Sequence, residues 1–426
     1  MRCLRLLIPC LAAGAACPAA EPPLLLTGAH VMKPDASGWR QGVVVLIRGD
    51  RIDAVASEKE INAPTDATRL DLAGLYLMPG LIDLHTHLLL HPYNEAKWDD
   101  QVLKESLELR TVRGVPAARA TLLAGFTTVR DLGTEGAGFA DVGLRDAIRQ
   151  RIVPGPRVYA STRAIVATGC YGPGGFDPRV PIPKGAQEAD GPADVRKAVR
   201  EQIAAGADWI KLYADYRRAP GEPATPTFSA QELRTAVEES HAAGKPCAAH
   251  ATTDEGIRRA VEAGFDTIEH GYGATRETLE LMKERGTVLV PTMAAAEAVA
   301  LYAGWHPESG KVPPGVAASR GSVTLAKEIG VEIAFGTDAG VFPHGRNARE
   351  LELMVEAGLT PAEALRAATI TAAKVLRQQG TLGTLAPGAL GDMIALGEDP
   401  LADIKALSDV RRVVARGALV ADPSRP

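Results

Sequence analysis

The chain has 426 residues, a formal net charge of −5 and only 4% aromatic residues. This length suits one large domain with a smaller second one. Because the charge is negative and no long basic run is present, the sequence argues against binding to nucleic acid or to anionic membrane surfaces. The 43 glycines and 30 prolines predict many turns, as repeated strand–loop–helix units require.

The first twenty residues have the features of a secretory signal. A basic start precedes an apolar stretch over residues 6–16, and small residues surround Cys17. We therefore predict a signal peptide over residues 1–20 and an exported protein, either periplasmic or secreted. Lipid attachment at Cys17 is the less favoured alternative, because Gly14 stands where a lipobox usually has leucine. No other apolar stretch is long and unbroken enough to span a membrane.

Short strands are predicted near both ends of the chain. Residues 24–77 contain several β-type runs, and Gly49-Asp50 between two of them is a hairpin turn signal. Residues 392–420 resume the same character. We predict a small β-sandwich domain assembled from both ends, residues 21–78 and 380–426.

Strand-like and helix-like segments alternate in the middle of the chain, residues 79–379. Apolar residues at spacings of three and four mark the helices. Several helices are predicted to end at Ala-Gly, where glycine takes a positive φ: Gly125, Gly206, Gly244 and Gly264. The predicted helices include residues 194–205, 230–243, 255–263 and 316–329, and the last predicted strand is residues 333–335. About eight such units predict an α/β fold, a TIM-like (β/α)8 barrel with its active site at the carboxyl ends of the strands.

Two histidines end the first predicted strand of this barrel, in Leu-Ile-Asp-Leu-His-Thr-His-Leu, residues 81–88. Side chains two residues apart in a strand face the same side. His85 and His87 therefore have the placement of half a metal site. The alternative is that one histidine caps the strand and the other is a hydrogen-bonded core residue. The rest of the chain decides between these interpretations.

Further residues of metal-ligand type lie at or near the ends of later predicted strands: Lys211, His250, His270 and Asp338. A barrel of parallel strands brings these ends to one face. We therefore predict that they share one metal site with His85 and His87.

Taken together, these motifs resemble the amidohydrolase superfamily of metal-dependent hydrolases. The motifs are residues 79–87, 125–131, the Lys211 strand, His250, 268–271, 335–338 and 388–392. The resemblance runs from about residue 24 to the C-terminus. The chain is most similar to the branch that holds imidazolonepropionase-like proteins, Xaa-Pro and related dipeptidases or carboxypeptidases, and ochratoxin-hydrolysing amidohydrolases.

The resemblance implies a two-metal site, with Zn²⁺ as the expected divalent ion. It assigns His85, His87 and Asp338 to one ion and His250 and His270 to the other. Lys211 is implied to bridge both ions as an N6-carboxylysine. An unmodified lysine would bring a positive charge beside two cations, whereas its CO2-derived carbamate is an anion. Asp338 is implied as general base and then general acid.

The residues after His250 bear on the type of reaction. Deaminases of this superfamily place a catalytic glutamate a few residues after the third histidine, but residues 251–255 have none in the expected position. Lys211 is also available as a bridge, so we predict two-metal amide hydrolysis. Two alternatives stay open: cyclic-amide hydrolysis or deamination of the imidazolonepropionase type, and a non-catalytic assembly module. Retention of all six ligand residues argues against the module.

The predicted substrates are dipeptides or N-acyl-L-amino acids with an apolar C-terminal residue such as Phe or Pro, and ochratoxin A fits the same description. Arg217 and Arg218 are candidates for binding a substrate carboxylate, with a solvated loop charge as the alternative. Further candidate pocket residues are Leu88, Tyr171, Tyr213 and Tyr272, for which core packing is the alternative. Tyr171 stands where many relatives have histidine. Small molecules are the expected partners, and we expect a homo-oligomer.

Overall fold

The computed structural model describes residues 22–177, 179–219 and 221–421. The predicted signal peptide, residues 1–20, lies outside these residues, as do the last five residues of the predicted second β segment. No helix among the described residues combines the length and the apolar character needed to cross a membrane.

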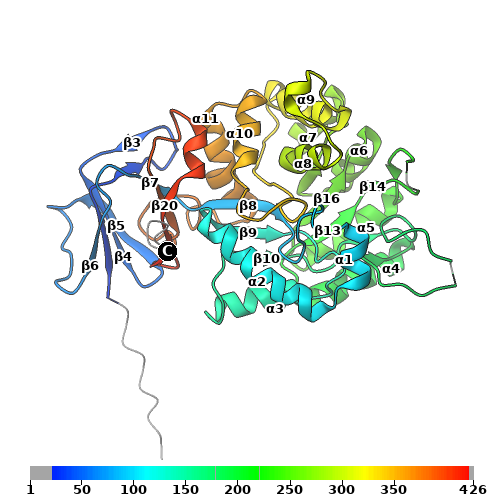
Figure 1. Cartoon of the computed structure of the whole chain (residues 1–426), viewed down its shortest axis with the longest axis horizontal. Coiled ribbons are helices and arrows are strands. Elements are labelled where there is room, and N and C mark those ends of the chain that lie inside the picture. Colours follow the sequence, from blue (N-terminus) through cyan, green and yellow to red (C-terminus); the bar gives the residue numbers. More distant parts are fainter. Residues whose placement is uncertain (1–21, 178, 220, 422–426) are drawn as a thin grey trace, which may run out of the picture.

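Strands from the two ends of the chain form two sheets at one end of the molecule (Figure 1, left). The first sheet has the order β5 (Arg51–Ser57), β4 (Val43–Arg48), β1 (Leu24–Thr27) and β6 (Thr68–Asp71). The second has the order β21 (Ala418–Ala421), β20 (Val410–Ala415), β19 (Met393–Leu396), β7 (Tyr76–Pro79), β2 (His30–Met32) and β3 (Trp39–Arg40).

The second sheet joins the two chain ends directly. β19 pairs antiparallel with β7, so that Ile394 lies opposite Met78. Gly49-Asp50 links β4 and β5 as a tight hairpin, because Arg48 pairs with Arg51. Alternating side chains of both sheets contribute to one buried apolar cluster that includes Leu26, Ile47, Leu77, Met393 and Val414. Burial of this shared apolar surface holds the two ends together.

The middle of the chain is a mixed α/β arrangement built on parallel strands. One sheet has the order β10 (Arg157–Ala160), β9 (Phe126–Asp131) and β8 (Leu81–Thr86). The other has the order β12 (Gln187–Glu188), β11 (Ile165–Val166), β13 (Ile210–Tyr213), β16 (Cys247–Ala251), β17 (Thr267–His270) and β18 (Val288–Val290). A short hairpin, β14 (Asp215–Tyr216) with β15 (Thr225–Pro226), follows β13.

Residues 333–335 connect these two sheets without forming a regular strand. Ala334 N donates to Leu289 O of β18 on one side, and Leu84 N of β8 donates to Phe335 O on the other. The predicted strand is therefore present only as an isolated bridge at Ile333, and a second isolated bridge follows it at Ala339. Among the described residues no continuous ladder closes the strands into a barrel.

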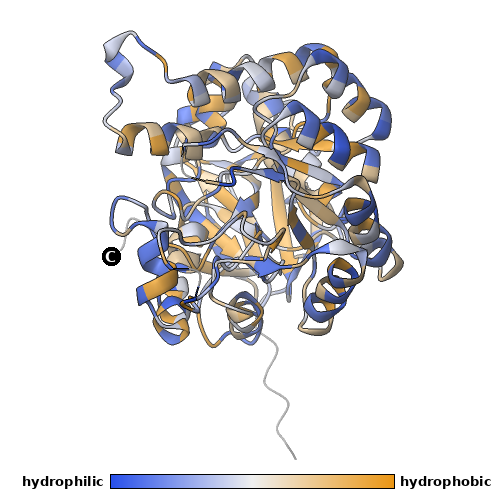
Figure 2. Cartoon of the chain, turned by 90° about the vertical axis from the view of Figure 1, so that its right-hand side faces the viewer, coloured by the Kyte–Doolittle hydropathy of each residue, from blue (hydrophilic) through white to orange (hydrophobic). Residues whose placement is uncertain are grey.

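Helices surround the parallel strands (Figure 1). Their bounds are α1 (Trp98–Lys104), α2 (Leu107–Leu123), α3 (Ala140–Arg149), α4 (Gly191–Ala204), α5 (Ala230–Ala242), α6 (Asp254–Ala263), α7 (Arg276–Arg285), α8 (Met293–Tyr302), α9 (Pro314–Ile329), α10 (Arg349–Glu356), α11 (Pro361–Arg366) and α12 (Ala372–Val375). In Figure 2 the central strands are largely hydrophobic, while many helices alternate hydrophobic and hydrophilic residues. This is the pattern of helices that bury one stripe against a sheet.

Local sequence signals explain where several helices begin and end. Ser229 and Glu232 form a reciprocal capping box at the start of α5. The predicted glycine ends are confirmed, since Gly125, Gly206, Gly244 and Gly264 all have φ between 72° and 105°. The four predicted helices are also present, as α4, α5, α6 and α9, with bounds that differ by at most three residues from those expected.

Candidate active site

The predicted metal ligands lie on adjoining parts of the parallel strands. They are His85 in β8, His87 directly after it, Lys211 in β13, His250 in β16, His270 at the end of β17, and Asp338 shortly after residues 333–335. Register aligns Tyr213 with His250, and Ala251 with His270. The amide nitrogen of Asp338 donates to the carbonyl of His85 over 2.7 Å. Parallel pairing thus brings these distant parts of the sequence to one place.

His85, His87 and Asp338 form the tightest group. One potential donor atom of each lies within 4.8 Å of the others. Oδ1 of Asp338 is 3.0 Å from Nε2 of His87 and 3.6 Å from Nε2 of His85. In the part of the chain that the structure describes, this is the only group of three or more His, Cys, Asp or Glu residues with such spacing. Two imidazole nitrogens and a carboxylate oxygen are ligands that suit a divalent zinc ion.

His250 and His270 lie beside this group. Their ring centroids are 4.5 Å apart, and the His270 ring is 5.2 Å from that of His85. Lys211 is 1% exposed, and its Nζ has no hydrogen-bond partner among the described residues. Burial lowers the pKa of Lys211 from 10.5 to about 8.

Buried partners orient the two histidines of the tight group. Nδ1 of His85 donates to Glu269 over 2.8 Å, and Arg130 binds the other oxygen of that carboxylate at 2.8 Å. Nδ1 of His87 donates to the carbonyl of Gly133 over 2.8 Å. These bonds place the proton on Nδ1 of each ring and leave Nε2 as the coordinating atom.

Backbone strain concentrates at this site. Glu135, His270, Thr292 and Asp338 all have positive φ, between 50° and 71°, although none is glycine. Thr292 hydrogen-bonds to Nδ1 of His270 through its hydroxyl at 2.7 Å. Such conformations cost roughly 1–3 kcal/mol each and persist where the surroundings enforce them, often at functional sites.

The electrostatics of the group follow from dense packing of opposite charges. Burial opposes ionisation of Asp338, but His85 and His87 outweigh it and hold the pKa of this carboxyl well below its usual range. Burial likewise opposes protonation of His87, yet Asp338 and Glu135 raise its pKa to about 9. Burial and the charge of Lys211 lower the pKa of His85 to about 4. The carboxylates therefore favour positive charge at this point of the protein.

The residues present fit a site for divalent cations. The donor atoms of His85, His87 and Asp338 are preorganised by buried hydrogen bonds. The buried Nζ of Lys211 lacks a hydrogen-bond partner among the described residues, which costs free energy unless something else satisfies it. Conversion of this amine to a carbamate would replace a buried positive charge by an anion, whose oxygens are of the ligand type that divalent cations take.

A cavity of about 390 Å³ opens onto this group. His85, His87, His250, His270 and Asp338 all line it. Of the predicted substrate contacts, Tyr171, Tyr213, Arg217 and Tyr272 also line it. Leu88 is not among its lining residues; it is fully buried in an apolar cluster with Leu89, Ala118 and Val129. Arg218 lies in a neighbouring hollow, where it contacts Cys170.

Several other residues that line the cavity are not among the predicted pocket residues, and those with an aromatic or acidic side chain are Tyr93, Glu135 and Tyr216. Tyr93 and Glu135 sit in loops after β8 and β9, and Tyr216 belongs to the short hairpin after β13. Their only sequence signal is a position shortly after a strand that carries or adjoins a predicted ligand. Glu269 likewise lies within a predicted motif, but the sequence gives no signal for its hydrogen bond to His85.

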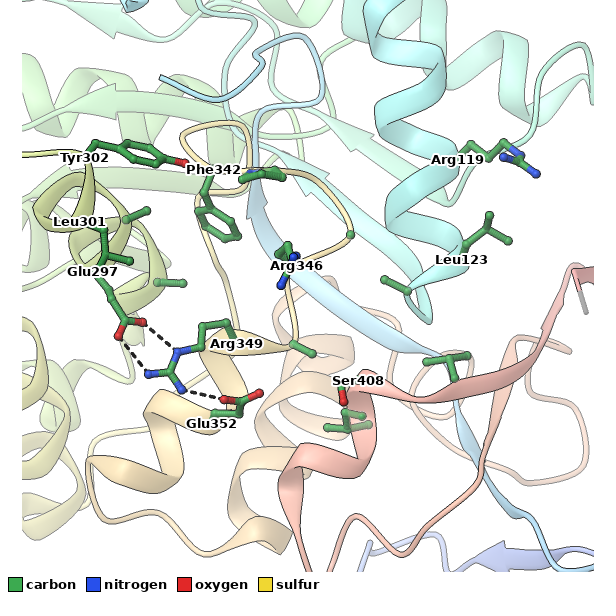
Figure 3. A pocket seen from close by; sticks show the side chains of 18 of the residues that line it. Arg119, Leu123, Glu297, Leu301, Tyr302, Phe342, Arg346, Arg349, Glu352 and Ser408 are labelled. Atoms are coloured by element: carbon green, nitrogen blue, oxygen red, sulfur yellow. Dashed lines mark hydrogen bonds and ion pairs between the residues drawn. The ribbon is translucent and has the colours of Figure 1, made fainter. Parts of the chain in front are cut away.

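A larger cavity, about 1150 Å³, lies elsewhere, between α2, α8, α10 and the C-terminal strands (Figure 3). Its lining includes none of the six predicted ligands. Arg349 on its wall is already paired with Glu297 and Glu352 (Figure 3). The chemistry therefore belongs to the smaller cavity at the strand ends.

The model of the amidohydrolase family matches residues 76–420, so the chain belongs to that family. It is an enzyme of the amide-hydrolysing type, and its superfamily typically binds divalent metals.

Individual relatives agree with the branches expected from the sequence motifs. The chain is 34% identical to an ochratoxinase of Aspergillus niger over 365 residues, covering 79% of this chain and 73% of the relative. A solved prolidase in complex with N-methylphosphonate-L-proline is 33% identical with a TM-score of 0.81, covering 94% of this chain and all of the other. A Xaa-Pro dipeptidase with methionine in its active site is 31% identical with a TM-score of 0.83, covering 93% and 99%.

Proposed function

We propose that the protein hydrolyses peptide-like amide bonds of dipeptides or N-acyl-L-amino acids and releases an apolar C-terminal residue such as Phe or Pro. The observation that carries this proposal is the preorganised group of His85, His87 and Asp338 on the floor of a cavity, near a buried lysine whose Nζ has no hydrogen-bond partner among the described residues. The names of the relatives, ochratoxinase, prolidase and Xaa-Pro dipeptidase, support the same class of substrate. Ochratoxin A, an amide of Phe, belongs to the same proposal.

The proposed cofactors are two divalent ions, Zn²⁺ by expectation. His85, His87 and Asp338 would hold one and His250 and His270 the other, with the Lys211 carbamate between them. When bound, such ions supply Lewis-acid activation of water and of the scissile carbonyl. Lys211 suits the carbamate role because burial lowers its pKa to about 8, which leaves part of the amine unprotonated and able to add CO2 near neutral pH.

Asp338 would move the proton. Its carboxylate lies 3.0 Å from His87 and remains ionised, because the surrounding imidazoles hold its pKa low. It would accept a proton from the attacking water and deliver it to the departing nitrogen. An amide nitrogen is a poor leaving group until it is protonated, so this second step is required.

Arg217 is the proposed partner of the substrate carboxylate. It is exposed at the cavity edge, its guanidinium lies 5.2 Å from the ring centroid of Tyr216, and no described carboxylate is paired with it. A guanidinium matches a carboxylate through two parallel hydrogen bonds. Tyr171, Tyr213 and Tyr272 would line the pocket for the apolar side chain.

The same proposal includes the wider organisation expected from the sequence. It comprises export after removal of residues 1–20, a closed (β/α)8 barrel over residues 79–379, a β-sandwich from residues 21–78 and 380–426, and a homo-oligomer. The two sheets with one shared apolar cluster support the sandwich. The hydrogen bonds of residues 333–335 to both β18 and β8 support the barrel.

A panel of dipeptides and N-acyl amino acids, with detection of released amino acids, tests the activity on zinc-loaded protein supplied with bicarbonate. We expect turnover of Phe- or Pro-terminated substrates and its loss in Lys211→Ala. The exposed Lys197→Ala on α4 serves as the control and should keep full activity. Inactivity across the panel, with ammonia release from amines instead, would refute the peptide-amide proposal. Near-normal turnover by Lys211→Ala would refute the bridging role.

A further inference from the structure

Glu135 is a buried carboxylate on the wall of the proposed active site. It follows β9, is 2% exposed, and holds a strained backbone with φ of 51°. One carboxylate oxygen, Oε2, accepts hydrogen bonds from Nε1 of Trp98 at 2.8 Å and from the hydroxyl of Tyr171. These two donors fix the side chain against the cavity, of which Glu135 is a lining residue.

The other oxygen of this carboxylate lacks a partner. Oε1 is buried and accepts no hydrogen bond from any described residue. It lies 3.8 Å from Nδ1 of His87, but that nitrogen already donates to Gly133. Arg110 is near, yet its guanidinium binds the backbone carbonyls of Leu89, Thr134 and Glu135 and not the carboxylate. A buried carboxylate left this way costs free energy unless a donor, best a cation, completes it.

Aromatic rings lie around Glu135, and they also favour a cation as its partner. The ring of Tyr171 lies 4.7 Å from that of Trp98, 4.5 Å from that of Tyr213 and 5.0 Å from that of Tyr216, measured between centroids. Aromatic faces attract cations, more strongly where water is excluded. An anionic oxygen beside such a wall is suited to an ammonium group.

The position of Glu135 also matches the length of a substrate. In a dipeptide, a single carbon separates the α-ammonium group from the scissile carbonyl. The carboxylate of Glu135 lies beside His87, whose Nε2 faces Asp338 at 3.0 Å. A group that holds the α-ammonium must therefore sit next to the metal-ligand residues, as Glu135 does. Arg217, which lines the same cavity, would bind the carboxylate at the other end of the dipeptide.

We propose that Glu135 binds the free α-ammonium group of the substrate, so that unblocked dipeptides are preferred over N-acyl amino acids. This inference rests on the proposed amide hydrolysis and narrows its substrate class. It makes Glu135 a specificity-determining residue that contacts substrate outside the reacting bond.

Two substrates that differ only in the ammonium group test this directly. Ala-Phe and propionyl-Phe have the same amide, the same leaving amino acid and nearly the same shape; Ala-Pro and propionyl-Pro form a second pair. Wild-type enzyme should cleave the alanyl substrate with kcat/KM about 10- to 100-fold higher, the range expected for one charge-assisted hydrogen bond in a buried site. This ratio needs no variant, so it tests the proposal even where a substitution disturbs folding.

Glu135→Gln keeps the shape and removes the charge. It should lower kcat/KM for Ala-Phe by about 10- to 100-fold, mainly through KM, and leave propionyl-Phe within about twofold. Glu188→Gln is the matched control, since Glu188 is paired with Lys184 on the neighbouring hollow and should change neither value.

Several outcomes would overturn the inference. Equal loss on both substrates would make Glu135 a positioning residue for His87 instead. Equal cleavage of both substrates by wild type, or an unchanged Ala-Phe rate in Glu135→Gln, would also refute it. Failure of wild type to cleave any member of either pair is a different result, because it refutes the proposed amide hydrolysis itself.

Discussion

Glu269 accepts a hydrogen bond from Nδ1 of His85 over 2.8 Å, and both side chains are almost wholly buried. Because the acceptor is a carboxylate, the proton sits on Nδ1 and Nε2 is free to coordinate. Arg130 binds the second oxygen of Glu269, so the chain from Arg130 through Glu269 to His85 is fully buried. One motif, Ile-Glu-His-Gly, thus supplies both a predicted ligand, His270, and the residue that orients another.

Glu269→Gln should weaken metal binding by about 10- to 100-fold, the usual effect of losing a partner that orients a ligand. Competition with a chelator on protein shown to be folded by circular dichroism measures this. Glu280→Gln, an exposed change on α7, should leave the affinity unchanged. Unaltered metal affinity in Glu269→Gln would contradict the orienting role.

Gly336→Ala should disturb the segment that carries Asp338. A Cβ atom at this position would lie 2.4 Å from Cγ1 of Val290 and 2.9 Å from Cβ of His85, so β8 and β18 cannot both keep their places. We expect a large loss of activity and of metal content, measured by elemental analysis. Gly143→Ala is the control: it lies inside α3 with no neighbour within 4 Å, and it should raise the free energy of unfolding by about 0.5–1 kcal/mol. Full metal content in Gly336→Ala would show that the segment carrying Asp338 accommodates the added Cβ atom.

Glu350 should make stability depend on pH. Its carboxylate accepts hydrogen bonds from the backbone N–H groups of Met293 and Ala294 at the start of α8. Burial nevertheless raises its pKa from 4.5 to about 8. Between these two values the native state holds a proton that the unfolded chain has released, so the free energy of unfolding falls as pH rises through this window.

The Glu350→Gln variant tests this pH dependence. It should reduce the slope of unfolding free energy against pH between 5 and 8 by up to about 1.4 kcal/mol per pH unit. Below about pH 4.5 it should also lower stability by about 1 kcal/mol, because one backbone donor loses its acceptor. This difference should reverse as pH rises towards 8, because Gln has no proton to lose. Denaturant unfolding at several pH values, with Glu284→Gln on the surface of α7 as control, measures both effects. An unchanged slope in Glu350→Gln would mean that Glu350 is ionised throughout.

Asp392 links the parallel strands to the C-terminal strands. Its carboxylate accepts hydrogen bonds from Nε of Arg157 and from the backbone N–H of Arg416, each over 2.6 Å. Asp392→Ala should lower the free energy of unfolding by about 1–3 kcal/mol, because both donors lose a nearly buried partner. Asp409→Ala, whose exposed pair with Arg411 resembles it chemically, should cost less than about 1 kcal/mol. Equal losses of unfolding free energy in the two variants would show that burial of Asp392 does not strengthen its hydrogen bonds.

The local features of the fold could be predicted from the chain because they depend on neighbours in sequence. Gly125, Gly206, Gly244 and Gly264 end helices since each is where the backbone needs a positive φ. The hairpin at Gly49-Asp50 is equally local. The sequence predicts a strand at residues 333–335, whereas the structure has only an isolated bridge there, because apolar side chains do not reveal that the backbone merely connects two sheets.

The candidate site likewise has features that are predictable from the sequence and features that depend on the whole fold. The positions of the candidate ligand residues at strand ends could be predicted from the sequence, since period-two alternation and the βα repeat are local properties. Whether a neighbouring residue packs in the core, as Leu88 does, or lines the cavity, as Glu135, Tyr93 and Tyr216 do, could not be predicted. Loops after different strands meet only once the parallel strands align, so these contacts depend on the whole fold. The unpartnered oxygen of Glu135 exists only in that assembled environment, and so does the specificity proposed for it.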